Sequence, residues 1–103
     1  MRLILLFDLP MLTKTDKRNY TRFRKALIKD GFSMIQFSAY MRFCKNAFDA
    51  DKHITRVKGF APNRGNIRIL NVTEKQYEGM VLVIGSETPT EQYVNEQFTL
   101  VIE

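Results

Sequence analysis

Residues 3–11 read Leu-Ile-Leu-Leu-Phe-Asp-Leu-Pro-Met, an apolar run that is interrupted by a single carboxylate. Successive side chains of an extended chain point to opposite faces, so a strand over residues 2–8 is apolar on both faces. Such a strand has to be covered on both sides. Asp8 then lies at the edge of a dry interior, where an ionised carboxylate needs a hydrogen-bond donor, a cation or a metal ion.

A helix follows this strand. Pro10 ends the strand, and Thr13 with Asp16 has the spacing of a capping box. The helix runs to about Lys29 and is closed by Gly31. Its apolar and basic residues fall on opposite faces of the 3.6-residue repeat, so the sequence predicts an amphipathic helix with a basic stripe.

The rest of the chain alternates between strand and helix patterns. Residues 34–43 alternate as one long strand, residues 49–60 return to helical spacing, and strands are expected at 66–73 and 80–84. The order is strand, helix, strand, helix, strand, strand. A split βαββαβ arrangement requires the second strand to bend at residues 36–38.

Both predicted helices have one apolar face, so they cover only one side of an α+β sheet. The first strand is apolar on both faces, and therefore the other side of the sheet also needs a cover. The simplest cover is a second copy of the chain, which predicts a two-fold homodimer through the open face of the sheet.

Charge divides the chain into a basic body and an acidic tail. Fifteen of the 16 Lys and Arg residues lie in residues 1–68, whereas residues 69–103 hold one lysine and six glutamates. We expect a folded domain over residues 1–85, and an acidic connector with a terminal strand over residues 86–103. The apolar residues proposed for partner binding in that strand are Phe98, Leu100 and Ile102. The strand pairs with the twin subunit, with another protein or with its own sheet.

Composition excludes several kinds of site. One cysteine and one histidine exclude an internal disulfide, a multi-cysteine zinc site and two-histidine metal motifs, and we expect Cys44 and His53 to be structural. No glycine-rich phosphate-binding motif is present. No apolar stretch approaches the roughly 20 residues of a membrane span, and the first one lacks a cleavage site, so a cytoplasmic protein is expected.

Asp8 has two interpretations. It can accept backbone N–H bonds in the turn before Pro10. Alternatively, a two-fold axis near the strand end brings two copies of Asp8 together, and a divalent cation such as Mg²⁺ relieves their repulsion. A bound cation of this kind activates water against a phosphodiester.

The basic stripe also has two interpretations, a solvated helix face or a surface that contacts a phosphate backbone without reading sequence. The third predicted strand lacks the aromatic pattern of an RNA-recognition motif, which favours backbone contact over base stacking. The predicted nucleic-acid-binding residues are Lys14, Lys17, Arg18, Arg22, Lys25 and Lys29.

In residues 1 to about 85 the chain resembles the small CRISPR-associated adaptation protein family, the partner of the spacer integrase. The resemblance rests on Phe7-Asp8 at the end of an apolar strand, a basic helix, and Gly31 followed by Gln36-Phe37-Ser38-Ala39-Tyr40. Gly65 before Asn66-Ile67-Arg68-Ile69-Leu70 completes it. The chain is also similar to the type II subtype of that family.

The resemblance implies a ferredoxin-like homodimer that bridges two integrase dimers and holds duplex DNA for spacer acquisition. It implies Asp8 as the metal ligand and catalytic residue, with Mg²⁺ as cofactor. Some members resemble magnesium-dependent endonucleases that act on RNA or DNA. The resemblance also implies that the partner carries out the integration chemistry, so that adaptation does not depend on cleavage by this chain. The alternative is a ferredoxin-like regulatory module that binds a small ligand, for which nucleic-acid binding and its salt dependence are not expected.

Overall fold

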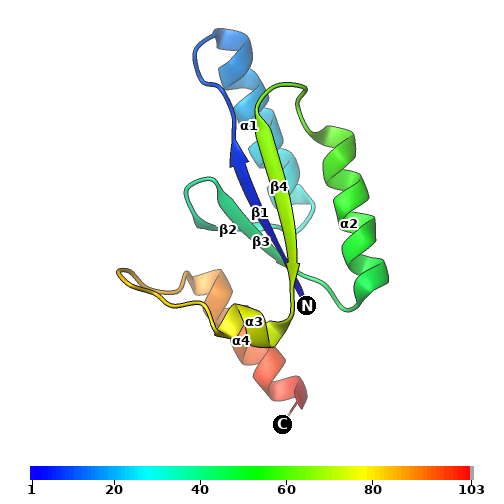
Figure 1. Ribbon diagram of the computed structural model, residues 1–103, viewed down its shortest axis with the longest axis vertical. Helices are drawn as coiled ribbons and strands as arrows, with labels where there is room; N and C mark the ends of the chain where they lie inside the picture. Colours follow the sequence, from blue (N-terminus) through cyan, green and yellow to red (C-terminus); the bar gives the residue numbers. More distant parts are fainter. Residues whose placement is uncertain (103) are drawn as a thin grey trace.

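The computed structural model describes the backbone of residues 1–102 and the side chains of residues 1–95. Four strands and four helices follow one another in this part of the chain (Figure 1). In chain order they are β1 (Arg2–Asp8), α1 (Lys14–Lys29), β2 (Ser33–Gln36), β3 (Ala39–Phe43), α2 (Ala47–Phe60), β4 (Asn66–Val72), α3 (Glu74–Glu78) and α4 (Pro89–Ile102). Within residues 1–102, no helix is both long and apolar enough to cross a membrane.

The four strands form one antiparallel sheet in the order β2-β3-β1-β4. This order, with one helix after β1 and one after β3, is the ferredoxin-like α+β fold that the resemblance implies. Residues 34–43 bend as the split arrangement requires, because Phe37 and Ser38 separate β2 from β3. Ser38 occupies the left-handed region with φ of 63°, which is uncommon for a residue other than glycine.

Helices α1 and α2 cover the same face of the sheet. Leu3, Leu5 and Phe7 of β1 are buried beneath Leu27 of α1 and Val57 of α2. The predicted capping box starts α1, since the Thr13 hydroxyl accepts from the Asp16 backbone N–H and the Asp16 carboxylate accepts from the Thr13 N–H. The helical predictions for these two segments are therefore confirmed.

The opposite face of the sheet, called here the open face, is partly covered by the chain's own helices. The sequence predicts a second copy of the chain as its cover. Helices α3 and α4 lie at the end of the sheet where β4 stops and β1 begins (Figure 1). Ile4 and Met41 of the open face are buried against Tyr77 of α3, and Val94 of α4 packs on the same cluster. Part of this face stays exposed, including Leu6 at 48% and Leu70 at 59%.

A buried arginine ties α3 and α4 to the sheet. The side chain of Arg2 is 1% exposed, and its Nε donates to both carboxylate oxygens of Glu74 at 2.9 and 3.1 Å. Its guanidinium carbon lies 3.8 Å from the centre of the Tyr77 ring, and Arg2 also donates to Asn95. The Tyr77 hydroxyl in turn donates to Glu91.

Two strand predictions for the tail are wrong. Residues 80–84 form no strand; they are an exposed irregular segment whose five apolar side chains are 46–93% exposed. Residues 98–102 belong to helix α4, not to a terminal strand. The side chains of Phe98, Leu100 and Ile102 lie outside the described residues, so their predicted role in partner binding stays a prediction.

Gly65 sets the end of β1 against the start of β4. Its φ is +102°, and a Cβ at this position would lie 2.7 Å from the Asp8 backbone oxygen and from Leu9 Cδ2. We expect Gly65→Ala to lower the free energy of unfolding by roughly 3 kcal/mol, because the backbone strain of the positive φ adds to the steric clash of the new Cβ. Urea denaturation measures this change.

Gly59→Ala is the matched control, since nothing lies within 4 Å of a Cβ at Gly59. It should leave stability unchanged or raise it by up to about 1 kcal/mol. Equal unfolding midpoints for the two variants would contradict the role given to Gly65.

Candidate nucleic-acid interface

The predicted basic stripe lies on the outer side of α1, away from the sheet. All six of its residues are exposed, whereas Phe23 and Leu27 on the opposite face of the helix are buried. Positions 14, 18, 22, 25 and 29 recur at intervals of three or four residues, which places them along one line of the helix surface. The stripe consists of Lys14, Lys17, Arg18, Arg22, Lys25 and Lys29.

The stripe residues differ from several other cations of the protein in having no ion-pair partner among the described side chains. Elsewhere, Arg2 pairs with Glu74, Arg56 with Asp30 and Arg64 with Asp16. None of the six stripe residues forms an ion pair with any carboxylate among residues 1–95, the part with described side chains. Their charges are therefore available to an external anion.

A shallow hollow follows the middle of the stripe. It has a volume of about 520 Å³ and is lined by Lys17, Arg18, Thr21, Arg22 and Lys25. Four of these five side chains are cations, and the fifth carries a hydroxyl that can donate to an oxygen. The hollow thus has the chemistry of a phosphate-contacting surface, since Lys, Arg and Thr all donate to phosphate oxygens.

The start of α1 is fixed by Asp16. The pKa of Asp16 lies below its usual 3.8, chiefly because the Thr13 backbone N–H donates to the carboxylate. Burial opposes this shift, and the Arg64 guanidinium at 3.2 Å adds to it. The ionised carboxylate therefore anchors the first turn of the helix that carries the stripe.

A lowered pKa in the folded state makes stability depend on pH. The contribution of the Asp16 charge is complete above the unfolded value, near 3.8, and is lost as pH falls through the lower folded value. We expect Asp16→Asn to be less stable than the wild type at neutral pH, with a difference that shrinks below about pH 3.8. Urea denaturation at several pH values measures it, and a difference that does not change with pH would contradict the assignment.

Asp8 lies at the end of β1 on the open face, where it pairs in register with Asn66 of β4. Its side chain is exposed, so the expected position at the edge of a dry interior is wrong. The carboxylate accepts no hydrogen bond from the described side chains or backbone, which does not favour the turn-capping alternative. It shares the open face with Leu6, two residues earlier.

Asp8 alone does not make a metal site. The described residues contain no group of three or more His, Cys, Asp or Glu side chains that could hold an ion. Magnesium takes about six oxygen ligands and usually keeps several waters, with one or two carboxylates from the protein. One chain supplies a single carboxylate here, so the residues fit Mg²⁺ only if another molecule adds ligands.

His53 and Cys44 are buried, as expected for structural residues. His53 Nδ1 lies 2.7 Å from Asp30 Oδ2, and His53 Nε2 lies 3.4 Å from Asp49 Oδ1, so the ring links the end of α1 to α2. Burial raises the pKa of the Cys44 thiol, which keeps it a poor nucleophile. The Asp30–His53–Arg56 cluster was not predicted from the sequence, because only the packing of the two helices brings these residues together.

The sequence of the chain matches that of a known protein family. The family model described as CRISPR associated protein Cas2 matches residues 1–80. The chain belongs to the Cas2 family. The match covers β1 through α3, and therefore includes Asp8 and the whole stripe of α1.

Curated relatives in the Cas2 family cover nearly all of the chain. A protein of Acidovorax ebreus is 44% identical over 95 residues, which are 92% of this chain and 93% of the relative. One of Lacticaseibacillus rhamnosus is 47% identical over 87 residues, 84% of this chain and 86% of the relative. One of Treponema denticola is 42% identical over 102 residues, 99% of both. Each is named CRISPR-associated endoribonuclease Cas2. The family resemblance seen in the sequence is thus confirmed.

Proposed function

We propose that this Cas2-family chain acts in spacer acquisition as a homodimer that holds duplex DNA by its phosphate backbone and bridges integrase subunits. The observation that carries the proposal is the stripe of six exposed cations on α1, which have no ion-pair partner among the side chains of residues 1–95. Phosphate contacts of this kind position a duplex without reading its sequence, which suits a protein that accepts many different spacers.

The exposed part of the open face supports the dimer. Leu6 and Leu70 lie on adjacent strands of this face and are about half exposed, and residues 80–84 add five exposed apolar side chains. A small chain gains stability by burying such surface against a second copy. β4 is an edge strand, so its outer backbone groups are available for pairing with an added segment.

A magnesium-dependent endonuclease is the second candidate function. Its support is the position of Asp8 on the same exposed end of the open face, together with the names of the relatives. A two-fold contact through this end would bring the Asp8 carboxylates of two subunits together, and these two carboxylates would hold the ion. Bound Mg²⁺ supplies an activated water, and Asp8 contributes the negative charge that binds the ion.

Titration of a fluorescent duplex across a range of salt concentrations tests the main proposal. We expect affinity to fall steeply as salt rises, because each phosphate contact releases counterions. A flat response would instead favour a ferredoxin-like module that binds a small ligand. Copurification with an integrase encoded beside this chain tests the bridging role.

A further inference from the structure

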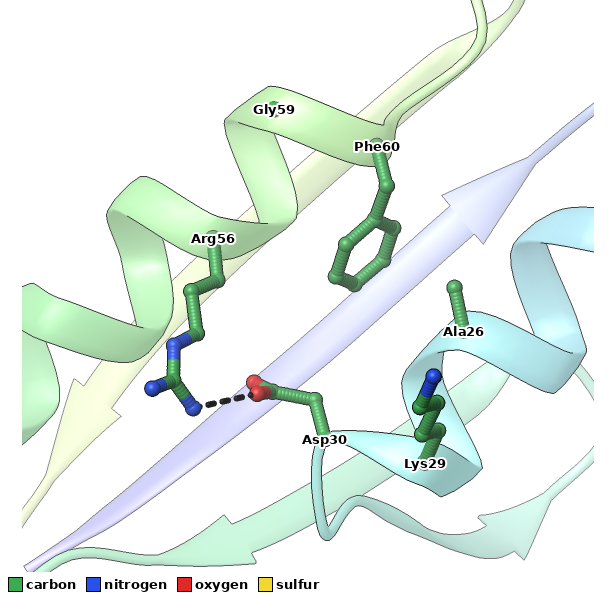
Figure 2. Close-up of a pocket in the computed structure, with 6 residues that line it drawn as sticks. All are labelled: Ala26, Lys29, Asp30, Arg56, Gly59 and Phe60. Atoms are coloured by element: carbon green, nitrogen blue, oxygen red, sulfur yellow. Dashed lines mark hydrogen bonds and ion pairs between the residues drawn. The ribbon is translucent and has the colours of Figure 1, made fainter.

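A hollow of about 380 Å³ lies between α1 and α2, at the end of the stripe. Figure 2 shows Arg56 and Phe60 extending from α2 toward α1, and Arg56 meeting Asp30 just after the last turn of α1. The residues that line the hollow are Ala26, Lys29, Asp30, Arg56, Gly59 and Phe60. Lys29 is also the last residue of the stripe, so the hollow continues the basic surface of α1 onto α2.

Asp30 holds Arg56 in place within this hollow. Asp30 Oδ1 accepts from an Arg56 guanidinium nitrogen at 3.0 Å, and Asp30 Oδ2 lies 2.7 Å from Nδ1 of the buried His53. The Arg56 side chain is 54% exposed and makes no other hydrogen bond with the described residues. A guanidinium has five N–H donors, so most of those on Arg56 remain available to a ligand.

The hollow also has room for a ligand. Gly59 has no side chain, and a Cβ placed there would meet nothing within 4 Å. The one carboxylate of the site, Asp30, is already bound by two partners. An anion in this hollow therefore faces two cations, Lys29 and Arg56, and guanidinium geometry suits two oxygens of a phosphate.

We propose that this hollow seats a phosphate group of the nucleic acid that follows α1, held between Lys29 and Arg56, with Asp30 as the positioning residue of Arg56. The inference rests on the proposed nucleic-acid binding and extends it from α1 to α2. Continuity with the stripe at Lys29 favours a nucleic-acid backbone over a separate acidic protein, because one polyanion can then contact both surfaces.

Arg56→Gln tests the seat by charge. Loss of one phosphate contact should lower the slope of log affinity against log salt by about 0.9 per bound subunit and weaken duplex binding. Lys58→Gln removes the same charge from the same helix, but Lys58 lines a different hollow, beside β4. We expect Lys58→Gln to leave the slope unchanged, and equal slopes for both variants would overturn the proposal.

Gly59→Leu tests the seat by volume without a change of charge. It should fill the hollow and weaken duplex binding as Arg56→Gln does. Circular dichroism and thermal unfolding show whether each variant is folded. Full duplex binding by a folded Gly59→Leu variant would overturn the seat.

The double variant Lys29→Gln/Arg56→Gln tests whether one phosphate is shared. A shared phosphate couples the two side chains, so the fold loss of the double variant should differ from the product of the single losses. Independent losses would contradict the shared seat. If variants of the other stripe residues weaken binding and Arg56→Gln and Gly59→Leu do not, only the seat fails. If the wild type shows no salt-dependent binding, the proposed function fails as well.

Discussion

A triple variant of the stripe, Arg22→Gln/Lys25→Gln/Lys29→Gln, should lose about half of the salt dependence of duplex binding. Each phosphate contact contributes about 0.9 to the slope of log affinity against log salt, so three lost contacts lower it by about 2.7 per bound subunit. Between 50 and 200 mM salt, the affinity of a wild type with six contacts should fall roughly a thousandfold, and that of the variant with three contacts about fortyfold. Fluorescence anisotropy across salt measures both slopes.

The matched control is Lys45→Gln/Lys58→Gln/Lys75→Gln. These three lysines are exposed and lie outside α1, and their loss changes the net charge by the same amount. We expect the control to weaken binding slightly, through long-range attraction alone, with the slope kept. If the control and the stripe variant behaved alike, binding would depend on net charge and not on a surface of α1.

Asp8→Asn should abolish magnesium-dependent cleavage of RNA or DNA while leaving duplex binding intact. The substitution keeps the size of the side chain and removes the charge that binds the cation, so we expect the cleavage rate to fall by about a hundredfold or more. Asp8 is exposed, and therefore the fold should not change. Cleavage of a labelled strand with Mg²⁺ and with a chelator measures the effect.

Asp51→Asn is the control for this variant, because Asp51 is an exposed acid on α2, far along the chain from β1. It should cleave like the wild type. Spacer acquisition in cells should continue with Asp8→Asn if the chain serves mainly as a scaffold. Cleavage that survives Asp8→Asn would show that Asp8 does not hold the ion, and lost duplex binding would show that Asp8 is structural.

The sheet and its two covering helices could be predicted because local patterns determine them. A continuous apolar run marks β1, alternation marks residues 34–43, and the 3.6-residue repeat with a capping box marks α1. The turn between β2 and β3 was ambiguous for a physical reason. It contains Phe37 and Ser38, with no Gly, Asn or Pro, and it relies on Ser38 at φ of 63°.

The strands expected in the tail are wrong because an apolar run forms a strand only where another strand is available to pair with it. Residues 80–84 have the composition of a strand, but α3 leads the chain away from the edge of β4 (Figure 1). Sequence signals for the tail helices were present. Thr73 with Gln76 forms a capping box, and Thr88 and Glu91 exchange the same reciprocal hydrogen bonds.

The candidate site also has a part that local sequence patterns predict and a part that depends on packing between distant segments. The stripe follows from helical periodicity within one element, and the structure places all six residues on one exposed surface. The bracing of Arg56 by Asp30 joins residues 26 positions apart, and only the packing of α2 beside α1 brings them together. The ion pair of Arg2 with Glu74 could not be predicted for the same reason, because nothing in the sequence of β1 indicates that Glu74 will neutralise its buried charge.

Sedimentation equilibrium of the wild type beside Leu6→Asp tests most directly whether two subunits pair through the exposed end of the open face. We predict that the wild type has twice the 12.1 kDa mass of one chain at micromolar concentration, and that a folded Leu6→Asp variant has the mass of one. A wild type that remains at 12.1 kDa throughout, or a dimer that Leu6→Asp leaves intact, would contradict the pairing.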